Sequence, residues 1–477
     1  MKTRTLVADN LTPVGAYAAL RQADPQRASF LFESVVGGDR WGRFSILGYR
    51  PRYEAVLGAN GKWTLTGDAQ QAGVSLDGAG DPLAAAEPLF RASDARSEVA
   101  NPAAKLARAH FGFLAWDLVH AIEKVPAWGA DAGGTNGALA RFVGGATLVV
   151  FDALAQTVTI AAEREEDVDR AHADLATPAT LKRIALPDRT RIPADVVVDT
   201  DDATYEAKVR RAQEYIAAGD AFQIVLARRF RVARSGRDPF DVYRAMRVIN
   251  PSPYMYFLDF PALEGEKTRT QILGASPETM VRLEDGVMTV RPLAGTRPRG
   301  KTLEEDAALE KELLADPKER AEHVMLIDLG RNDVGRVAEI GSVELARRME
   351  IERYSHVMHI VSEVRGKVAS TTPPLEVVRA AFPAGTLSGA PKVRAMQIIR
   401  ELEARPRGIY GGAVGYVAKT GDLDFAIAIR TAVCRGDAFE VTAGAGIVES
   451  SVPKSEADET RAKARGVLCA IEAAPQG

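Results

Sequence analysis

Short, mostly apolar runs recur along the chain, and tight-turn signals separate them in pairs. Three such pairs are Tyr53–Leu57 with Trp63–Thr66, Met280–Leu283 with Val287–Val290, and Ala413–Val417 with Leu423–Ile429. Asn60-Gly61 and Asp285-Gly286 separate the first two pairs, and both dipeptides favour the type I′ turn of a tight hairpin. Repeated hairpins predict large antiparallel sheets rather than a doubly wound parallel sheet.

Apolar residues at helical spacing mark two amphipathic helices. The two stripes consist of Tyr205, Val209, Ala212 and Ile216, and of Ala464, Val467, Leu468 and Ile471. Gly219 is suited to end the first helix. Ser455, which follows Pro453, is a candidate N-cap for the second.

Another apolar segment runs from residue 142 to residue 162 and is the best candidate for a membrane span. Glycine and polar residues interrupt it at Gly144, Gly145, Asp152 and Gln156. A membrane-spanning helix needs roughly 18 or more apolar residues in succession, so we expect two strands and a turn instead. The first ten residues, MKTRTLVADN, also lack the apolar core of a signal peptide.

The predicted fold class is α+β: a large antiparallel β-sandwich with helices packed outside. A chain of 477 residues is too long for one simple core, so we expect two lobes. The stretch 186–203 carries Pro187, Pro193 and several charges, and we interpret it as a linker. It would join an N-terminal lobe, residues 1–185, to a catalytic domain, residues 204–477.

Charge and cysteine content narrow the function classes. The 61 basic and 64 acidic residues give a net charge of −3, which argues against a nucleic-acid-binding surface. The two cysteines, Cys434 and Cys469, provide no disulfide framework and are typical of a reducing cytoplasm.

Two pairs of glutamates share the same spacing. Glu319 and Glu322 lie in KERAEH, and Glu456 and Glu459 lie in SEADET. Residues three apart project from one face of a helix, and carboxylates suit a hard divalent cation such as Mg²⁺. Spacing alone also fits a solvated helix face, or acids that stabilise the helix macrodipole.

These two segments and the run GASPETMVRLEDGVMTVRPLAGTRPRG, residues 274–300, resemble the chorismate-utilising enzymes. The resemblance is closest to the anthranilate synthase component I group. It is dense from Phe222 to Ala470 and looser before Thr200. It implies a β-sandwich whose sheets enclose the active site.

The resemblance also implies a magnesium site and a substrate. Glu322 and Glu459 match the direct Mg²⁺ ligands of the family, and Glu319 and Glu456 match the second acid of each pair. Chorismate, the implied substrate, is a dianion. A cation would keep four glutamates from repelling it.

Substrate-binding residues are implied by YGGAVGYV, DFAIAIRTAV, TAGAGIV and PLAGT. The matching positions are Gly295, Thr296, Tyr410, Arg430, Gly444, Ala445 and Gly446. Tyr410 and Arg430 match the residues that hold the enolpyruvyl carboxylate, and a planar guanidinium binds a carboxylate through two hydrogen bonds. Glycines allow backbone N–H groups to approach an anion closely.

Three residues match catalytic positions. Glu278 of SPET is the candidate general acid, because the C4 hydroxyl must be protonated as it leaves. His359 of SHVMHIVSEV matches a histidine near the reacting ring, where it would assist the elimination or position the leaving hydroxyl, and Thr296 lies in PLAGT. Without the resemblance, Glu278 would pass for a polar turn residue and His359 for a core histidine.

Two positions separate the members of the family. Aminodeoxychorismate synthases carry a nucleophilic lysine where this chain has Ala294. Isochorismate and salicylate synthases carry a water-activating lysine where it has Gln223. The pattern therefore favours amination at C2 with loss of the C4 hydroxyl, and then loss of pyruvate to give anthranilate. A synthase that releases 2-amino-2-deoxyisochorismate remains the alternative, and an inactive tryptophan-sensing scaffold is a further one.

Two partners are also implied. The chain has no glutamine amidotransferase motif, so we expect a separate glutaminase subunit to supply ammonia within a hetero-oligomer. FLFES and NPSPYMYF match a feedback site for L-tryptophan formed by Ser34, Pro253, Tyr254 and Met255. Phe32 departs from the usual leucine, and core packing is the alternative reading of both segments.

Overall fold

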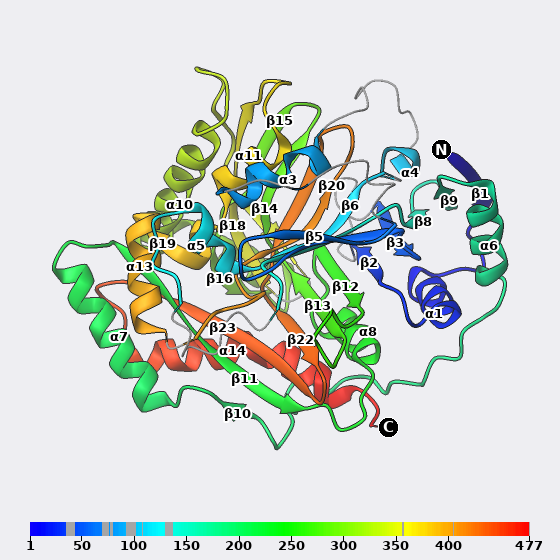
Figure 1. Ribbon diagram of the computed structural model, residues 1–477. Helices are drawn as coiled ribbons and strands as arrows, with labels where there is room; N and C mark the ends of the chain where they lie inside the picture. Colours follow the sequence, from blue (N-terminus) through cyan, green and yellow to red (C-terminus); the bar gives the residue numbers. More distant parts are fainter. Residues whose placement is uncertain are drawn as a thin grey trace.

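The computed structural model describes residues 1–34, 43–68, 76, 80–91, 102–106, 108–128, 137–354, 357–403 and 405–476. Two large antiparallel sheets face each other, and most of the helices cover their outer faces (Figure 1). The predicted α+β sandwich is therefore confirmed.

Sheet A has twelve strands among the described residues. In spatial order they are β1 (Lys2–Val7), β9 (Thr157–Ala162), β8 (Thr147–Asp152), β3 (Phe44–Tyr49), β2 (Ser29–Glu33), β12 (Tyr254–Phe260), β13 (Thr270–Ser276), β22 (Thr431–Arg435), β23 (Ala438–Ile447), β11 (Gln223–Ala233) and β10 (Val197–Val198), with β19 (Gly389–Ala390) paired to β11.

Sheet B has eleven strands in the part of the chain that the structure describes. In spatial order they are β16 (Leu293–Pro298), β18 (Val357–Lys367), β15 (Val287–Val290), β14 (Thr279–Glu284), β21 (Leu423–Ile427), β20 (Ala413–Val417), β6 (His110–Leu114), β7 (Ala140–Gly144), β4 (Tyr53–Leu57) and β5 (Trp63–Gly67), with β17 (Glu344–Arg353) paired to β18.

The helices differ widely in length. They are α1 (Pro13–Ala23), α3 (Pro82–Phe90), α4 (Pro102–Leu106), α5 (Val119–Ile122), α6 (Glu165–Leu175), α7 (Asp202–Ala217), α8 (Pro239–Ile249), α9 (Leu303–Ala315), α10 (Pro317–Gly335), α11 (Pro374–Ala381), α12 (Gly385–Ser388), α13 (Lys392–Leu402) and α14 (Pro453–Ala473), with a 3₁₀ turn at Trp116–Leu118.

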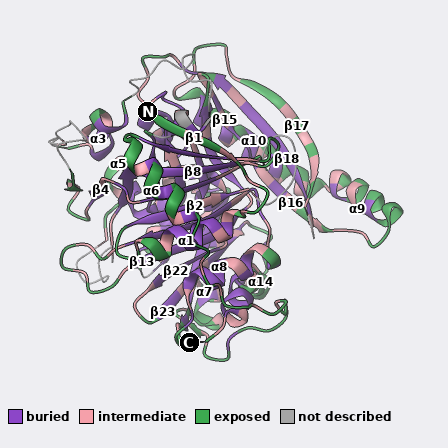
Figure 2. Ribbon diagram, turned by 90° about the vertical axis from the view of Figure 1, so that its right-hand side faces the viewer, coloured by how far each residue is buried: buried purple, intermediate pink, exposed green. Residues whose placement is uncertain are grey.

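Aromatic side chains fill the space between the sheets. Phe30 of sheet A stacks on Phe111 of sheet B at 4.3 Å, and Tyr256 and Phe113 belong to the same buried cluster. A second cluster lies on the outer face of sheet A beneath α1, α6, α8 and α14. Figure 2 shows this buried interior beneath exposed helix faces, and α9 extends away from the body. The hydrophobic effect thus holds the layers together.

Both sheets continue across the predicted lobe boundary. Met255 of β12 pairs with Glu33 of β2 in sheet A, and Ala413 of β20 pairs with Leu114 of β6 in sheet B. The division at residues 186–203 remains a prediction about the sequence. In space, strands from before and after it share the same hydrogen-bonded ladders.

Several local predictions are confirmed. All three predicted hairpins form, as β4–β5, β14–β15 and β20–β21, although β21 ends at Ile427 rather than Ile429. The stripe predicted for the first helix lies on α7, and Gly219 follows that helix with a left-handed φ of 83°. Cys434 and Cys469 are both buried, and neither forms a disulfide.

Two local predictions are wrong. The segment 142–162 contributes to three strands, β7, β8 and β9, because turns at both glycine-rich and polar interruptions reverse the chain. Ser455 is not an N-cap: α14 begins at Pro453, whose ring suits the first helical turn, and Val452 occupies the cap without a side-chain bond.

In the described part of the chain, no helix is long and apolar enough to cross a membrane.

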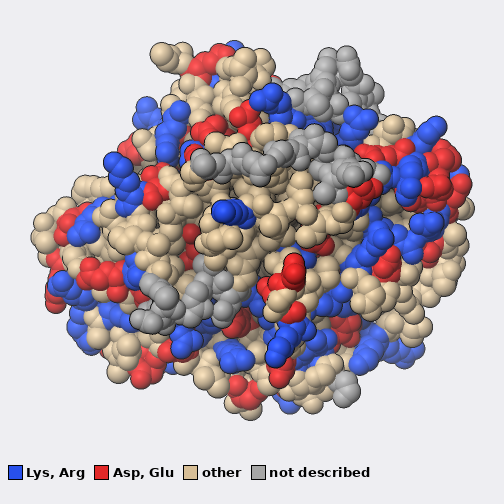
Figure 3. Space-filling model, viewed as in Figure 1, with Lys and Arg blue, Asp and Glu red and all other residues tan. Residues whose placement is uncertain are grey.

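The charges on the surface are interspersed. Figure 3 shows Lys, Arg, Asp and Glu mixed over the visible face, without a large field of one sign. This distribution agrees with the net charge of −3 and offers no broad basic surface on that face.

Candidate active site

The candidate site lies where the chain passes from one sheet to the other. Glu278 occupies the connection between β13 of sheet A and β14 of sheet B, and Arg430 occupies the connection between β21 of sheet B and β22 of sheet A. Backbone hydrogen bonds join the two crossings: Ile427 N–H donates to Glu278 O at 3.0 Å, and Ala275 N–H donates to Arg430 O at 3.2 Å. Two segments distant in sequence, one with an acid and one with a cation, are thus joined through their backbones.

Glu278 is held in its protonated form. Its side chain is buried, and burial raises its pKa to about 8, against smaller opposing effects of Thr386 and Lys463. Thr386 Oγ1 of α12 donates a hydrogen bond to Glu278 Oε1 at 2.9 Å. At neutral pH this carboxyl therefore retains a proton that it can donate.

A β-bulge places His359 beside the Gly295-Thr296 turn. Thr296 of β16 pairs with His359 of β18, and the register shifts at Gly295, whose φ of 68° favours glycine. His359 Nδ1 lies 3.0 Å from Gly295 O and 3.0 Å from Thr296 Oγ1. Since a carbonyl oxygen only accepts, Nδ1 carries the proton. Burial lowers the pKa of His359, so the ring is neutral and Nε2 keeps a lone pair.

Arg430 is a cation without an ion-pair partner among the described residues. Its φ of 50° is in the left-handed region, which is uncommon for a residue with a side chain. Burial lowers its pKa, and within the described chain its guanidinium forms no hydrogen bond or ion pair. Tyr410, also buried, is the neighbour that opposes this lowering. Arg430 is half-buried and has no partner for its charge among the described residues, so an anionic ligand would be stabilised here.

The strand that contains Gly444, Ala445 and Gly446 borders this cation. A Cβ at Gly444 would approach the Tyr410 hydroxyl to 2.8 Å, and one at Gly446 would approach Gln223 Nε2 to 2.8 Å. Alternate residues of a strand share a face, so Tyr410 and Gln223 lie over the same face of β23. The glycines thus keep room for two polar side chains and for close approach to the backbone.

The four predicted glutamates lie in the first two turns of two helices. Glu319 and Glu322 belong to α10, and Glu456 and Glu459 to α14. Burial raises the pKa of Glu322, and Glu319 raises it further; burial also raises the pKa of Glu456, as does Glu459. Gln223 Nε2 donates to Glu322 Oε1 at 3.3 Å, which ties α10 to the polar face of β23.

The acids do not form a closed cluster in the present arrangement. Among the described residues, no three His, Cys, Asp or Glu side chains are placed to ligate one metal ion. Lys463 Nζ lies 2.7 Å from Glu459 Oε1 and 3.0 Å from Gly444 O. Its charge opposes the raised pKa of Glu322, as does that of Lys318. Lysines on both helices therefore partly neutralise the acids.

Three residues of the site were missed by the sequence reasoning. Lys463 lies one helical turn after Glu459, so the spacing i, i+4 could have revealed it. Thr386 and Tyr354 had no such local signal. Thr386 reaches Glu278 over 108 residues of sequence, and the ring of Tyr354 lies edge-on to that of His359 at 5.6 Å.

The predicted inhibitor residues are also brought together. Ser34 follows β2, and the pairing of Glu33 with Met255 places it beside Tyr254 of β12, next to Pro253. The Ser34 Oγ is buried and finds no hydrogen-bond partner among the residues described. A buried hydroxyl without a partner is costly, and a polar ligand would satisfy it.

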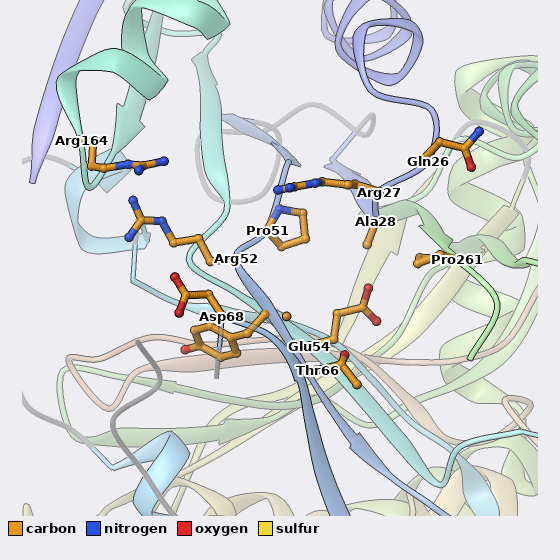
Figure 4. A pocket seen from close by; sticks show the side chains of 12 residues that line it. Gln26, Arg27, Ala28, Pro51, Arg52, Glu54, Thr66, Asp68, Arg164 and Pro261 are labelled. Carbon is orange, nitrogen blue, oxygen red and sulfur yellow. The ribbon is translucent and has the colours of Figure 1, made fainter. Parts of the chain in front are cut away.

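One cavity lies apart from these residues, and a second, smaller one lies against two of them. Figure 4 shows a surface cavity of about 440 Å³ between Arg27, Arg52 and Arg164 on one side and Glu54 and Asp68 on the other. It contains no predicted site residue. A much smaller cavity of about 40 Å³ lies against Glu278 and Thr386.

Comparison with known proteins agrees with this geometry. Residues 42–468 match the family model described as chorismate binding enzyme. Anthranilate synthase component 1 of Acinetobacter calcoaceticus is 43% identical, over 99% of this chain and 95% of that protein. The crystal structure of anthranilate synthase component I from Streptococcus pneumoniae is 33% identical with a TM-score of 0.75, and it covers 97% of this chain and 99% of that one.

A more distant structure shares only the fold. The menaquinone-specific isochorismate synthase of Escherichia coli is 17% identical with a TM-score of 0.70, over 98% of this chain and 94% of that one. The same two-sheet architecture is therefore compatible with more than one reaction.

Proposed function

The chain belongs to the chorismate binding enzymes, and from that premise we propose that it is the synthase component of an anthranilate synthase. It converts chorismate and ammonia to anthranilate and pyruvate, a step in tryptophan biosynthesis. The observation that carries the proposal is that the unpaired Arg430 and the protonated Glu278 lie on two sheet crossings that backbone hydrogen bonds join. One group binds an acid and the other supplies a proton, as the first half-reaction requires.

The enolpyruvyl carboxylate of chorismate binds Arg430. A guanidinium that lacks a carboxylate partner gains two parallel hydrogen bonds from such a ligand. The Tyr410 hydroxyl and the backbone of Gly444 and Gly446 also contact this carboxylate, and Gly295-Thr296 of β16 contacts the ring. Lys463 lies close enough to the acids to attract the second carboxylate.

Amination requires an acid for the leaving group and no base for the nucleophile. Ammonia attacks C2, the two ring double bonds shift towards C4, and the C4–O bond breaks as Glu278 protonates the departing hydroxyl to water. The new C2 ammonium group then loses a proton to the solvent. Gln223 is neutral and cannot activate water, and Ala294 cannot attack the ring. Both residues favour ammonia as the nucleophile over water or an enzyme lysine.

Pyruvate elimination requires a base. His359 is neutral with its proton on Nδ1, so Nε2 can accept the proton from C2. The C–H electron pair completes the aromatic ring, and the C3–O pair leaves with the enolpyruvate. Thr296 Oγ1 and Gly295 O fix the orientation of the imidazole.

The glutamate pairs would hold Mg²⁺. Glu322 and Glu459 would be the ligands, with Glu319 and Glu456 as the second acid of each pair. The donor set fits a hard cation, because carboxylate oxygens are its preferred ligands and because burial, together with a neighbouring acid, raises the pKa of Glu322 and of Glu456. When bound, the ion neutralises the ring carboxylate and withdraws electron density from the ring.

Two partners complete the proposal. A glutamine amidotransferase subunit supplies ammonia, since this chain has no amidotransferase motif of its own. L-tryptophan inhibits the enzyme from the pocket of Ser34, Pro253, Tyr254 and Met255. The unsatisfied Ser34 hydroxyl and the pairing of β2 with β12 support this pocket.

The test is turnover by the purified chain. Chorismate, Mg²⁺ and ammonium are mixed with it, and the appearance of anthranilate fluorescence is followed with and without EDTA. The proposal expects fluorescence that depends on ammonium and disappears with EDTA. No turnover, even with a glutaminase subunit and glutamine present, would favour the inactive tryptophan-sensing scaffold instead.

A further inference from the structure

Tyr254 contacts the segment that carries Glu278 from both of its ends. In the β12–β13 ladder, Tyr254 pairs with Ser276, two residues before Glu278. Its hydroxyl lies 2.9 Å from the Oγ1 of Thr279, one residue after Glu278. Tyr254 therefore contacts residues on both sides of Glu278 in the sequence, one through its backbone and one through its hydroxyl.

The hydroxyl of Tyr254 also reaches the neighbouring crossing. It donates to Asp424 Oδ1 of β21 at 2.9 Å, so Thr279 Oγ1 is the donor of the other bond. Burial raises the pKa of Tyr254, and the hydroxyl stays protonated. The phenol is thus a fixed bridge between β12, β14 and β21.

The turn that carries Glu278 has little freedom of its own. Glu278 N–H donates to Ser276 Oγ at 3.3 Å, and its carbonyl accepts from Ile427 N–H at 3.0 Å. Its carboxyl accepts from Thr386 at 2.9 Å. The position of the Glu278 carboxyl therefore depends on the residues adjacent to it in sequence and on Thr386.

Tyr254 is also one of the residues of the predicted regulatory pocket for L-tryptophan. Pro253 and Met255 flank it, and Met255 pairs with Glu33 of β2, next to the unsatisfied hydroxyl of Ser34. A ligand that occupies this pocket lies against β12 at the residue whose hydroxyl holds Thr279.

We propose that Tyr254 is the positioning residue that couples the regulatory pocket to Glu278. When the pocket is empty, the bond between Tyr254 and Thr279 keeps the Glu278 carboxyl against Thr386. A ligand that displaces Tyr254 weakens that bond and moves the acid away from the leaving oxygen. The inference rests on the tryptophan pocket of the proposed function and adds the residues that transmit the signal.

The coupling must work in both directions. If tryptophan weakens chorismate binding by some factor, chorismate weakens tryptophan binding by the same factor. Removal of the connecting hydroxyl should bring this factor towards one while each ligand still binds. This makes coupling measurable apart from affinity.

Tyr254→Phe is the direct test, because it keeps the ring and removes the hydroxyl. Thr279→Val removes the same bond from the other side and serves as a second variant. Tyr256→Phe is the matched control: Tyr256 lies on the same strand, but its hydroxyl bonds to Thr431 Oγ1 at 2.6 Å, away from the Glu278 turn. Tryptophan affinity is measured by calorimetry with and without saturating chorismate and Mg²⁺, in the absence of ammonium.

In the wild type and in Tyr256→Phe, chorismate should weaken tryptophan binding at least about fivefold, the lower end of typical allosteric coupling. In Tyr254→Phe and Thr279→Val the factor should fall below about twofold, while tryptophan affinity without chorismate changes less than about threefold. Both variants should also lose kcat about tenfold with little change in KM, part of the roughly 10²–10⁴ that a positioned acid supplies.

Wild-type coupling in both variants would overturn the inference, and so would an equal loss of coupling in Tyr256→Phe. A wild-type chain that forms anthranilate but binds no tryptophan would overturn the regulatory part of the proposed function and the coupling with it. A chain that binds tryptophan but forms no anthranilate would overturn the proposed activity instead. The failures are therefore distinguishable.

Discussion

The Oγ1 of Thr386 donates a hydrogen bond to Oε1 of Glu278 across 2.9 Å, and so joins the short helix α12 to the crossing between the two sheets. The carboxyl of Glu278 is buried and its pKa is raised to about 8. Since Oε1 accepts from Thr386, the proton of Glu278 is available at the other oxygen. This pair fixes the direction in which the acid delivers its proton.

Glu278→Gln should nearly abolish activity. The amide keeps the shape and the contact with Thr386 but has no proton to transfer to the leaving hydroxyl. A fall in kcat of roughly 10²–10⁴ is expected. The variant should still bind chorismate, which equilibrium titration will show, and a fall of less than about tenfold would exclude Glu278 as the general acid.

The same variant tests the burial of the acid through stability. An ordinary glutamate titrates near 4.5 and the folded Glu278 near 8, so the native state holds the extra proton between these values. Wild-type stability should therefore fall as pH rises from about 4.5 to 8 through this group. Over this range, chemical denaturation should show the free energy of unfolding of Glu278→Gln rising relative to that of the wild type by an amount on the order of a few kcal/mol. Parallel stability curves would contradict the raised pKa.

Thr386→Val should shift the pH profile. The hydrogen bond from Thr386 stabilises the ionised carboxylate of Glu278 and so lowers its pKa. Without the bond, the pKa rises further and Glu278 remains protonated to higher pH. The alkaline limb of kcat should move to higher pH while the maximum of kcat falls. An unmoved or acid-shifted limb would show that another group governs it.

Arg430→Lys should affect substrate binding more than stability. Lysine keeps the charge but loses the planar fork, so KM for chorismate should rise roughly tenfold or more. Because Arg430 has no ion pair among the described residues, its replacement leaves no stranded partner. Steady-state kinetics and thermal unfolding measure the two effects. A large loss of Tm with an unchanged KM would assign Arg430 a structural role.

His359→Asn separates the two half-reactions. Asparagine still offers an N–H for Gly295 O but lacks the lone pair of Nε2. Amination should continue while pyruvate elimination slows, so an aminated product that retains the enolpyruvyl group should accumulate. Mass analysis of the quenched reaction detects it. Normal release of pyruvate would exclude His359 as the base.

Much of the local structure was accessible from periodicity and turn chemistry. The Asn60-Gly61 and Asp285-Gly286 hairpins and the α7 stripe are short-range features, and all three formed as predicted. The start of α14 was missed because Pro453 at its first turn competes with Ser455 as a start signal. Local rules do not decide between the two.

Long-range contacts could not be predicted from single segments. The bond of Thr386 to Glu278 spans 108 residues, and that of Tyr254 to Asp424 spans 170. The bulge at Gly295 that fixes the tautomer of His359 arises only when β16 pairs with β18. Sequence patterns identified Glu278, His359 and Arg430 as site residues. The groups that set their protonation states and orientations come together only in the tertiary fold.

The central claim, that one chain carries out both amination and pyruvate elimination, is tested most directly by product stoichiometry. The purified chain is given chorismate, Mg²⁺ and ammonium, and anthranilate and pyruvate are measured in the same sample. The account predicts equal amounts of the two products. Release of 2-amino-2-deoxyisochorismate without pyruvate would contradict it.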